Sequence, residues 1–199
     1  MKTREKILRV GIELFLKKGY NKASMALIAT EVGIKKASLY HHFKNKEELA
    51  ICVIDYFDEK MGEWSIEKKK HITSFKQFLH LIIISIPEFR NVEDVILGKE
   101  ISNDVSMGFN DFTLALSREN KEVKNKIKEI FNKTQMALKK SIETAQQNEI
   151  IRNDIDAGTI AIIIHSIIEG AGVLSNFDNE IDDQVFQNIY EELLKLLTR

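Results

Sequence analysis

The sequence is poor in cysteine, proline and glycine. Its 199 residues include one cysteine, Cys52, one proline, Pro87, and nine glycines. A lone cysteine excludes an intramolecular disulfide and a cysteine-rich zinc site. Proline and glycine are the residues that interrupt helices, so their scarcity favours a chain that is mostly helix. We therefore predict an all-α fold.

Long apolar runs are also missing. The longest ones are far shorter than the roughly 20 residues that a transmembrane helix needs. The N-terminal segment MKTREKILRVGIELF has basic residues, but it has neither an unbroken apolar stretch nor a small-residue cleavage site. A signal peptide requires both of these features. We expect a cytoplasmic protein with no membrane partner.

The two signs of charge are unevenly distributed along the chain. Residues 1–46 hold eleven basic and three acidic residues, a net charge of +8. The remainder holds 18 basic and 27 acidic residues, a net charge of −9. A basic segment on an acidic body is an electrostatic footprint for a polyanion. The charge pattern therefore favours nucleic-acid binding by residues 1–46.

A helix-turn-helix pattern lies at residues 24–49, largely within this basic segment. Ser24 stands where the N-cap of a short helix over residues 25–32 belongs, and Gly33 stands just past the end of that helix. A second short helix is expected over residues 36–42. Two helices joined by a short turn with a glycine are typical of DNA-binding proteins whose second helix enters the major groove.

The rest of the chain also has helical periodicity. Asn45 with Glu48, Ser74 with Gln77, Asn120 and Asp156 stand where helices are expected to begin. The apolar run LIIISI at residues 81–86 is also compatible with a buried strand, although we favour helix. Helices are expected over residues 3–18, 45–70, 74–86, 110–117, 121–148, 157–176 and 183–197, with a helical turn or two within 92–103.

The last two expected helices are apolar over more than one face. Between Ile160 and Ile168 only His165 and Ser166 are not apolar. Two adjacent helices of this kind predict a helix-bundle contact between two copies of the chain, and burial within one subunit is the alternative. The residues expected at this homodimer interface are Ile163, Ile167, Val185, Phe186, Ile189, Leu193 and Leu197.

Three segments of the chain form a recognisable set: ILRVGIELFLKKGY, SMALIATEVGIKKASLYHHFKNKEELA and the later turn RNDIDAGTIA. With the first two, residues 3–50 closely resemble the tetracycline-repressor (TetR) family of transcription regulators, and the turn is similar too. The family usually has a serine, threonine or similar capping residue where this chain has Lys35. We therefore expect a recognition helix without a side-chain cap, and a lysine whose charge suits a DNA phosphate.

The resemblance implies which residues contact DNA. Ala37 would lie against a thymine methyl group, and Lys36 and Ser38 would reach base edges. Tyr40 and His42 would contact phosphates, as would Lys46, because a lysine at a helix N-terminus suits a nearby phosphate. The DNA-contacting residues are predicted to be Ser24, Met25, Lys35, Lys36, Ala37, Ser38, Tyr40, His41, His42 and Lys46.

The resemblance also implies an effector pocket in the C-terminal half of each subunit. The abundance of phenylalanine, isoleucine and methionine favours an apolar or amphipathic ligand, and plain core packing is the alternative for each residue. The pocket residues are predicted to be Phe57, Met61, Trp64, Phe78, Phe109, Phe112, Met136, His165 and Glu169.

Together these patterns predict an all-α regulator of about nine helices. Residues 1–46 form a three-helix DNA-binding domain, and residues 47–199 form a helical effector-binding and dimerisation domain. The expected function is a ligand-responsive repressor that binds a pseudo-palindromic operator as a homodimer, without metal or cofactor. One alternative is a dimeric DNA-binding protein with no small-molecule effector, or with a protein partner instead. Another is a helical enzyme that uses His165 and Glu169, with His80 nearby.

Overall fold

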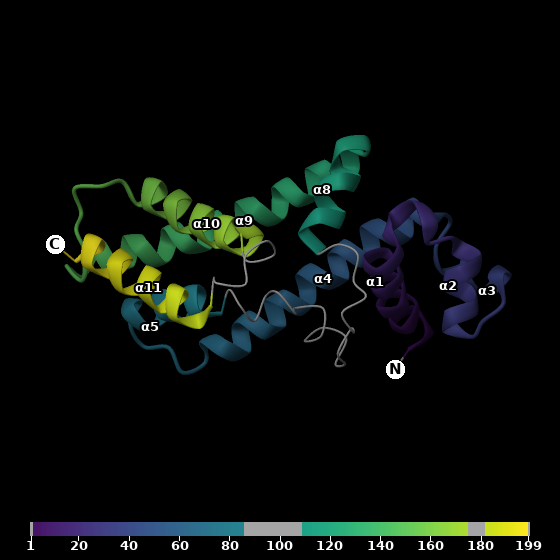
Figure 1. Ribbon diagram of the computed structural model, residues 1–199, viewed down its shortest axis with the longest axis horizontal. Coiled ribbons are helices and arrows are strands. Elements are labelled where there is room, and N and C mark those ends of the chain that lie inside the picture. Colours follow the sequence, from purple (N-terminus) through teal and green to yellow (C-terminus); the bar gives the residue numbers. More distant parts are fainter. Residues whose placement is uncertain (1, 86–108, 175–181, 199) are drawn as a thin grey trace. The chain divides into compact units, whose positions relative to one another are not determined.

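The chain folds into helices throughout the part that the structure describes. The computed structural model describes residues 2–85, 109–174 and 182–198. Its helices are α1 (Thr3–Lys22), α2 (Met25–Val32), α3 (Lys36–His42), α4 (Lys46–Lys69), α5 (Phe75–Ile84), α8 (Phe109–Glu119), α9 (Lys121–Gln147), α10 (Ala157–Leu174) and α11 (Asp183–Leu197) (Figure 1). The predicted all-α fold is confirmed, and the run LIIISI is helical as far as Ile84. The turns predicted within 92–103 lie outside the described residues.

The predicted caps explain where the helices begin. Each cap side chain accepts a hydrogen bond from the backbone N–H three residues further on, which satisfies one orphan donor of the first turn. The bonds are Leu27 N to Ser24 Oγ at 3.2 Å, Glu48 N to Asn45 Oδ1 at 2.8 Å, Gln77 N to Ser74 Oγ at 3.2 Å, Val123 N to Asn120 Oδ1 at 2.9 Å and Thr159 N to Asp156 Oδ1 at 2.9 Å. These predicted helix starts are therefore confirmed.

Two glycines shape the N-terminal helices. Gly19 has φ 74° and interrupts α1, which continues for a short piece to Lys22 beyond the predicted end at residue 18. Gly33 has φ 78° and ends α2 in the left-handed conformation. Side chains with a Cβ rarely adopt a positive φ, so glycine is required for both bends.

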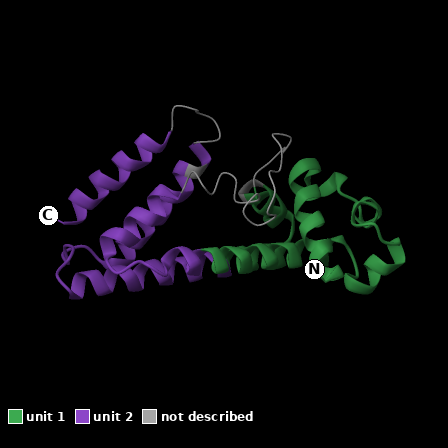
Figure 2. Ribbon diagram, turned by 90° about the horizontal axis from the view of Figure 1, so that it is seen from below, with its two compact units in different colours: residues 1–64, 93–128 green, residues 65–92, 129–199 purple. Residues whose placement is uncertain are grey.

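The chain divides by its internal packing into two compact units. Unit 1 comprises residues 1–64 and 93–128, and unit 2 comprises residues 65–92 and 129–199 (Figure 2). Helix α8 therefore belongs to the same unit as the helix-turn-helix. The functional boundary predicted at residue 46 stays a prediction.

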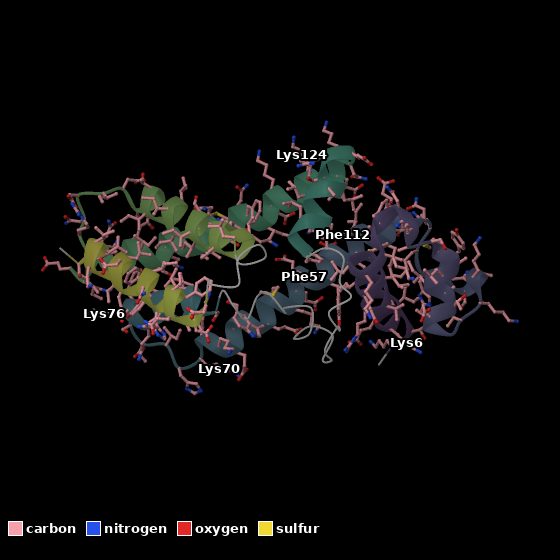
Figure 3. The ribbon with its side chains drawn as sticks, viewed as in Figure 1. Lys6, Phe57, Lys70, Lys76, Phe112 and Lys124 are labelled. Atoms are coloured by element: carbon pink, nitrogen blue, oxygen red, sulfur yellow. The ribbon has the colours of Figure 1, made fainter. Side chains whose placement is uncertain are left out.

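The core of unit 1 joins α8 to the N-terminal helices. Phe15 of α1 is fully buried, and Phe112 of α8 is 1% exposed. Their rings stack with centroids 5.3 Å apart and planes 12° apart. Phe109 of α8 stacks on Phe57 of α4 in the same way, with planes 6° apart. Figure 3 labels Phe57 and Phe112 on these two helices. Helix α8 therefore anchors itself through aromatic rings on α1 and α4.

The core of unit 2 uses apolar faces of α5, α9, α10 and α11, and it includes three of the predicted dimer-interface residues. Helix α11 packs along α5. Phe186, Leu193 and Leu197 of α11 are only 0%, 8% and 5% exposed and lie in this core. Burial within one subunit, the alternative to the predicted dimer contact, fits these three side chains, and their place at an interface between two copies stays a prediction.

No helix among the described residues is both long enough and apolar enough to cross a membrane.

Candidate nucleic-acid interface

The turn between α2 and α3 is held by its own backbone. Ile34 N donates to Ala29 O at 2.9 Å, and Gly33 N donates to Thr30 O at 3.0 Å. These bonds satisfy the last carbonyl groups of α2. Lys6 Nζ of α1 donates to Val32 O at 2.9 Å and adds a positive charge at the same helix end. The direction in which α3 leaves the turn is therefore well determined.

Helix α3 has one buried anchor and a wide accessible side. Leu39 is fully buried, and Phe43 just beyond the helix is 1% exposed. Tyr40 is 44% exposed, and Lys36 Nζ lies 5.9 Å from the centroid of its ring. The predicted DNA-contacting residues on α3 and at its start are all accessible to some degree: Lys35, Lys36, Ala37, Tyr40 and His41 are exposed, and Ser38 and His42 are half-buried.

The expectation that α3 lacks a side-chain cap is confirmed. Lys35 occupies the N-cap position with extended backbone, and its side chain makes no capping hydrogen bond. The first N–H groups of α3 therefore have no side-chain acceptor, and such groups are suited to a phosphate oxygen.

Two of the predicted DNA-contacting residues, Ser24 and Met25, lie at the start of α2 in different environments. Ser24 Oγ is already the acceptor that caps α2. The side chain of Met25 is only 6% exposed, because it packs into the core of unit 1. For Met25, only the backbone N–H would be available for the predicted phosphate contact.

Lys46 has an intramolecular role that the sequence did not predict. Its Nζ donates to Tyr20 O at 2.8 Å and to Asn21 O at 3.4 Å, and it lies 4.2 Å from the centroid of the Tyr20 ring. Partial burial lowers the pKa of this ammonium group. A cation in the first turn of α4 opposes the helix dipole, and the end of α1 supplies the compensating acceptors. The unfavourable position of Lys46 at a helix start is the feature of the sequence that indicates a nearby acceptor for its charge.

Arg4, another cationic side chain of unit 1, also makes intramolecular contacts. The Arg4 guanidinium lies 5.1 Å from the centroid of the Phe43 ring and donates to Cys52 Sγ at 3.4 Å. Burial raises the pKa of the Cys52 thiol, so this cysteine is a poor nucleophile.

The residues predicted for the effector pocket divide between the two units. Phe57, Met61, Trp64, Phe109 and Phe112 belong to unit 1, and Phe78, Met136, His165 and Glu169 belong to unit 2. Phe112 is a core residue, since its buried ring stacks on Phe15. Met136 is 65% exposed. The Phe78 ring lies 5.4 Å below the ammonium group of Lys69, whose pKa is lowered by burial.

His165 of α10 forms a polar cluster in unit 2. It is 8% exposed, its Nδ1 lies 2.6 Å from Gln135 Nε2, and its Nε2 lies 3.4 Å from Glu169 Oε1. The Phe131 ring meets the imidazole edge-on at 5.4 Å. His80 packs against Tyr190, with ring centroids 4.8 Å apart. Among the described residues, no three His, Cys, Asp or Glu side chains are arranged to hold a metal ion.

An exposed apolar stripe runs along α10. Ile162, Ile163, Val173 and Leu174 are 59%, 45%, 50% and 57% exposed. The two pairs are separated by about three helical turns, so they share one side of the helix. Ile163 is a predicted interface residue and the other three are not, because the apolar sequence of α10 does not indicate which side of the helix is exposed. The predicted interface residues Ile167, Val185 and Ile189 are half-buried.

Both halves of the chain match families of known regulators. Residues 7–52 match the model for bacterial regulatory proteins of the tetR family, and residues 112–188 match the model for the tetracyclin repressor-like C-terminal domain. The biofilm operon icaADBC HTH-type negative transcriptional regulator IcaR of Staphylococcus aureus is 32% identical over 123 residues, in an alignment that covers 58% of this chain and 66% of IcaR. The chain spans 31% and 66% of the lengths of two curated relatives that it matches.

Solved structures agree with these matches. A TetR-family transcriptional regulator from Cytophaga hutchinsonii has a TM-score of 0.76 at 21% identity, over 98% of this chain and 92% of that one. FadR from Bacillus subtilis, in complex with stearoyl-CoA, has a TM-score of 0.69 at 23% identity, over 97% of this chain and 96% of FadR. At such identities the likeness shows a common fold. Together with the matches to both family models, it shows that the chain belongs to the TetR family of bacterial transcriptional regulators.

Proposed function

We propose that this chain is a ligand-responsive transcriptional repressor that binds operator DNA as a homodimer. The observation that carries the proposal is the accessible side of α3, which presents Lys36, Tyr40 and His41 from a segment with a net charge of +8. The relative IcaR is a negative transcriptional regulator, which favours repression over activation. Family membership also argues against the enzyme alternative.

DNA recognition follows from this arrangement. Each subunit would insert α3 into the major groove, and a dimer would match two half-sites separated by roughly 34–36 Å or a multiple of it. Lys36, Ser38 and Ala37 would face base edges. Phosphate contacts by Lys35, Tyr40, His42 and Lys46 would fix the register without reading sequence. Such a dimer requires a pseudo-palindromic operator.

The test begins with the DNA that the protein retains from the genome of its own source. We expect a pseudo-palindromic sequence, protected in a footprint, whose affinity falls steeply with salt. A protein with about 6–10 phosphate contacts loses roughly 10³–10⁵ in affinity between about 50 and 200 mM salt. An unrelated duplex of equal length is the control. Affinity that is flat over this range, or equal for both duplexes, would rule out the proposed recognition.

The exposed stripe of α10 is our candidate for the dimer contact. Ile163→Glu would place an unpaired charge in that apolar contact, which is costly. We expect the dissociation constant of the dimer to rise about tenfold or more, a change of about 1.4 kcal/mol per factor of ten, as measured by analytical ultracentrifugation. Ile66→Glu is the matched control, because Ile66 is 68% exposed on α4. An Ile163→Glu protein that dimerises like the wild type would remove this stripe from the interface.

The effector is proposed to be apolar or amphipathic. FadR from Bacillus subtilis is solved with stearoyl-CoA, and a regulator from Saccharomonospora viridis is solved with choline. In this chain the cluster of His165, Gln135 and Glu169 offers polar groups beside the half-exposed ring of Phe131. The other predicted pocket residues stay candidates, except Phe112, whose ring is buried in the core of unit 1 against Phe15.

An effector acts only through a difference in affinity between the DNA-bound and the released states. To shift the population from 1:99 to 99:1, that difference must be about 10⁴-fold. A thermal-shift screen with fatty acids and acyl-CoA compounds, followed by operator release, tests this part. Stabilisation without release, or no stabilisation by any compound, would favour the alternative without a small-molecule effector.

A further inference from the structure

The contact between Tyr20 and Lys46 links the end of α1 to the start of α4. Lys46 is the first residue of α4, and its ammonium group bonds the backbone carbonyl of Tyr20 at 2.8 Å. The same ammonium group lies 4.2 Å from the centroid of the Tyr20 ring. A cation this close to an aromatic face is attracted by the ring quadrupole. Tyr20 therefore holds Lys46 with both its backbone and its side chain.

The Lys46 ammonium group is held in place and still has an N–H donor available. Lysine has three N–H donors, and the carbonyl oxygens of Tyr20 and Asn21 accept from Lys46 at 2.8 and 3.4 Å. Among the described residues, these two carbonyl oxygens are the hydrogen-bond acceptors of the Lys46 ammonium group. One donor is left for an external acceptor, and partial burial makes the charge less hydrated, which lowers the pKa of Lys46.

The Tyr20 ring is itself held by neighbouring aromatic side chains. Its centroid lies 5.6 Å from that of Phe15, and the Phe15 ring stacks on Phe112 of α8 at 5.3 Å. Phe15 is fully buried and Phe112 is 1% exposed, so neither ring has room to reorient in a closely packed core. The position of the Lys46 ammonium group is thus determined through Tyr20 by rings on α1 and α8.

We propose that Tyr20 is a positioning residue for DNA binding, which holds the Lys46 ammonium group ready for a backbone phosphate of the operator. The inference rests on the proposed function, since it requires that Lys46 contacts DNA. A lysine side chain carries much rotamer entropy, and its prior immobilisation lowers the cost of ordering it on DNA. The contact is with phosphate, so it contributes equally to all sequences.

The experiment compares salt dependence rather than affinity alone. Operator binding is measured over a range of KCl concentrations for the full-length wild type, Lys46→Met, Tyr20→Leu, Tyr20→Phe and the double variant Tyr20→Leu/Lys46→Met. The slope of log K against log[KCl] is negative. We expect Lys46→Met to reduce its magnitude by about 1 for each lysine lost. Tyr20→Leu should weaken binding about two- to fivefold, because the Lys46 side chain must then be ordered on DNA, and it should make the slope less steep as well.

Two further variants separate positioning from plain stability. Tyr20→Phe keeps the ring and should bind with the wild-type slope. The double variant should behave like Lys46→Met alone, because Tyr20 acts through Lys46. A Tyr20→Leu protein with reduced affinity but an unchanged slope, or effects that multiply in the double variant, would overturn the proposal in favour of a structural role.

The remaining outcomes are also decisive. If Tyr20→Leu does not fold by circular dichroism, Tyr20→Met removes the ring with a more adaptable side chain. If neither variant folds, Tyr20 is a folding residue and the proposal is overturned. If the wild type binds its operator with a steep slope and Lys46→Met keeps that slope, this inference fails while the proposed function stands. If the wild type shows no salt-dependent operator binding, the proposed function itself fails.

Discussion

Phe112→Ala is expected to lower the free energy of unfolding by about 3–5 kcal/mol, the range for truncation of a buried phenylalanine. The Phe112 ring is 1% exposed and stacks on Phe15 of α1. Its removal leaves a cavity between α8 and α1 that the surrounding rings fill only in part. Urea unfolding followed by circular dichroism measures the effect, with the slope of the transition checked for two-state behaviour.

Phe131→Ala is the matched control for this experiment. Phe131 is the same residue type, but it lies on α9 with 45% of its surface exposed. Its edge-on contact with His165 is worth about 1 kcal/mol, so a loss of that size is expected. Phe112→Leu, which keeps most of the apolar volume, should cost less than about 1.5 kcal/mol. Equal losses for Phe112→Ala and Phe131→Ala would show that α8 is not anchored on α1.

Lys36→Ala is expected to weaken operator binding about 30-fold or more. The reason is that a base contact in the major groove is worth about 1–3 kcal/mol, and a dimer loses two of them. Lys36 is exposed at the start of α3, and nothing in the core depends on it, so the protein should remain folded. Binding to operator variants, measured by fluorescence anisotropy at fixed salt, should also show relaxed specificity at the base pair that Lys36 reads.

Lys76→Ala tests whether charge alone explains such a loss. Lys76 is also an exposed lysine, and it lies on α5 in unit 2 (Figure 3). Both variants remove one positive charge per subunit, so a general electrostatic effect would weaken both to a similar extent. We expect Lys76→Ala to bind like the wild type. A folded Lys36→Ala protein with wild-type affinity and specificity would remove Lys36 from the recognition surface.

Local sequence determined most of the secondary structure. Helix starts at Ser24, Asn45, Ser74, Asn120 and Asp156 were predicted correctly, because a capping bond joins residues only three positions apart. The glycine bend that positions α3 and the missing cap at Lys35 depend on equally short segments. The candidate DNA-contacting surface could therefore be located before any tertiary contact was known.

The tertiary structure decided how the apolar and charged faces are used. Apolar periodicity predicts that Phe186 and Phe112 are buried, but it does not say against what, and the partners are α5 and α1. In α10 nearly every side is apolar, so only packing distinguishes the buried Ile164 from the exposed Ile163.

The same division holds for Lys46. The sequence determined that a lysine occupies an electrostatically unfavourable helix start, while its partner Tyr20 is 26 residues away. Contacts over such distances depend on how helices pack, which no local pattern encodes. The sequence by itself thus determined the fold class, the capped helix starts and the helix-turn-helix motif. Only the tertiary structure decided which side chains fill the core, which stay exposed, and which residue holds Lys46.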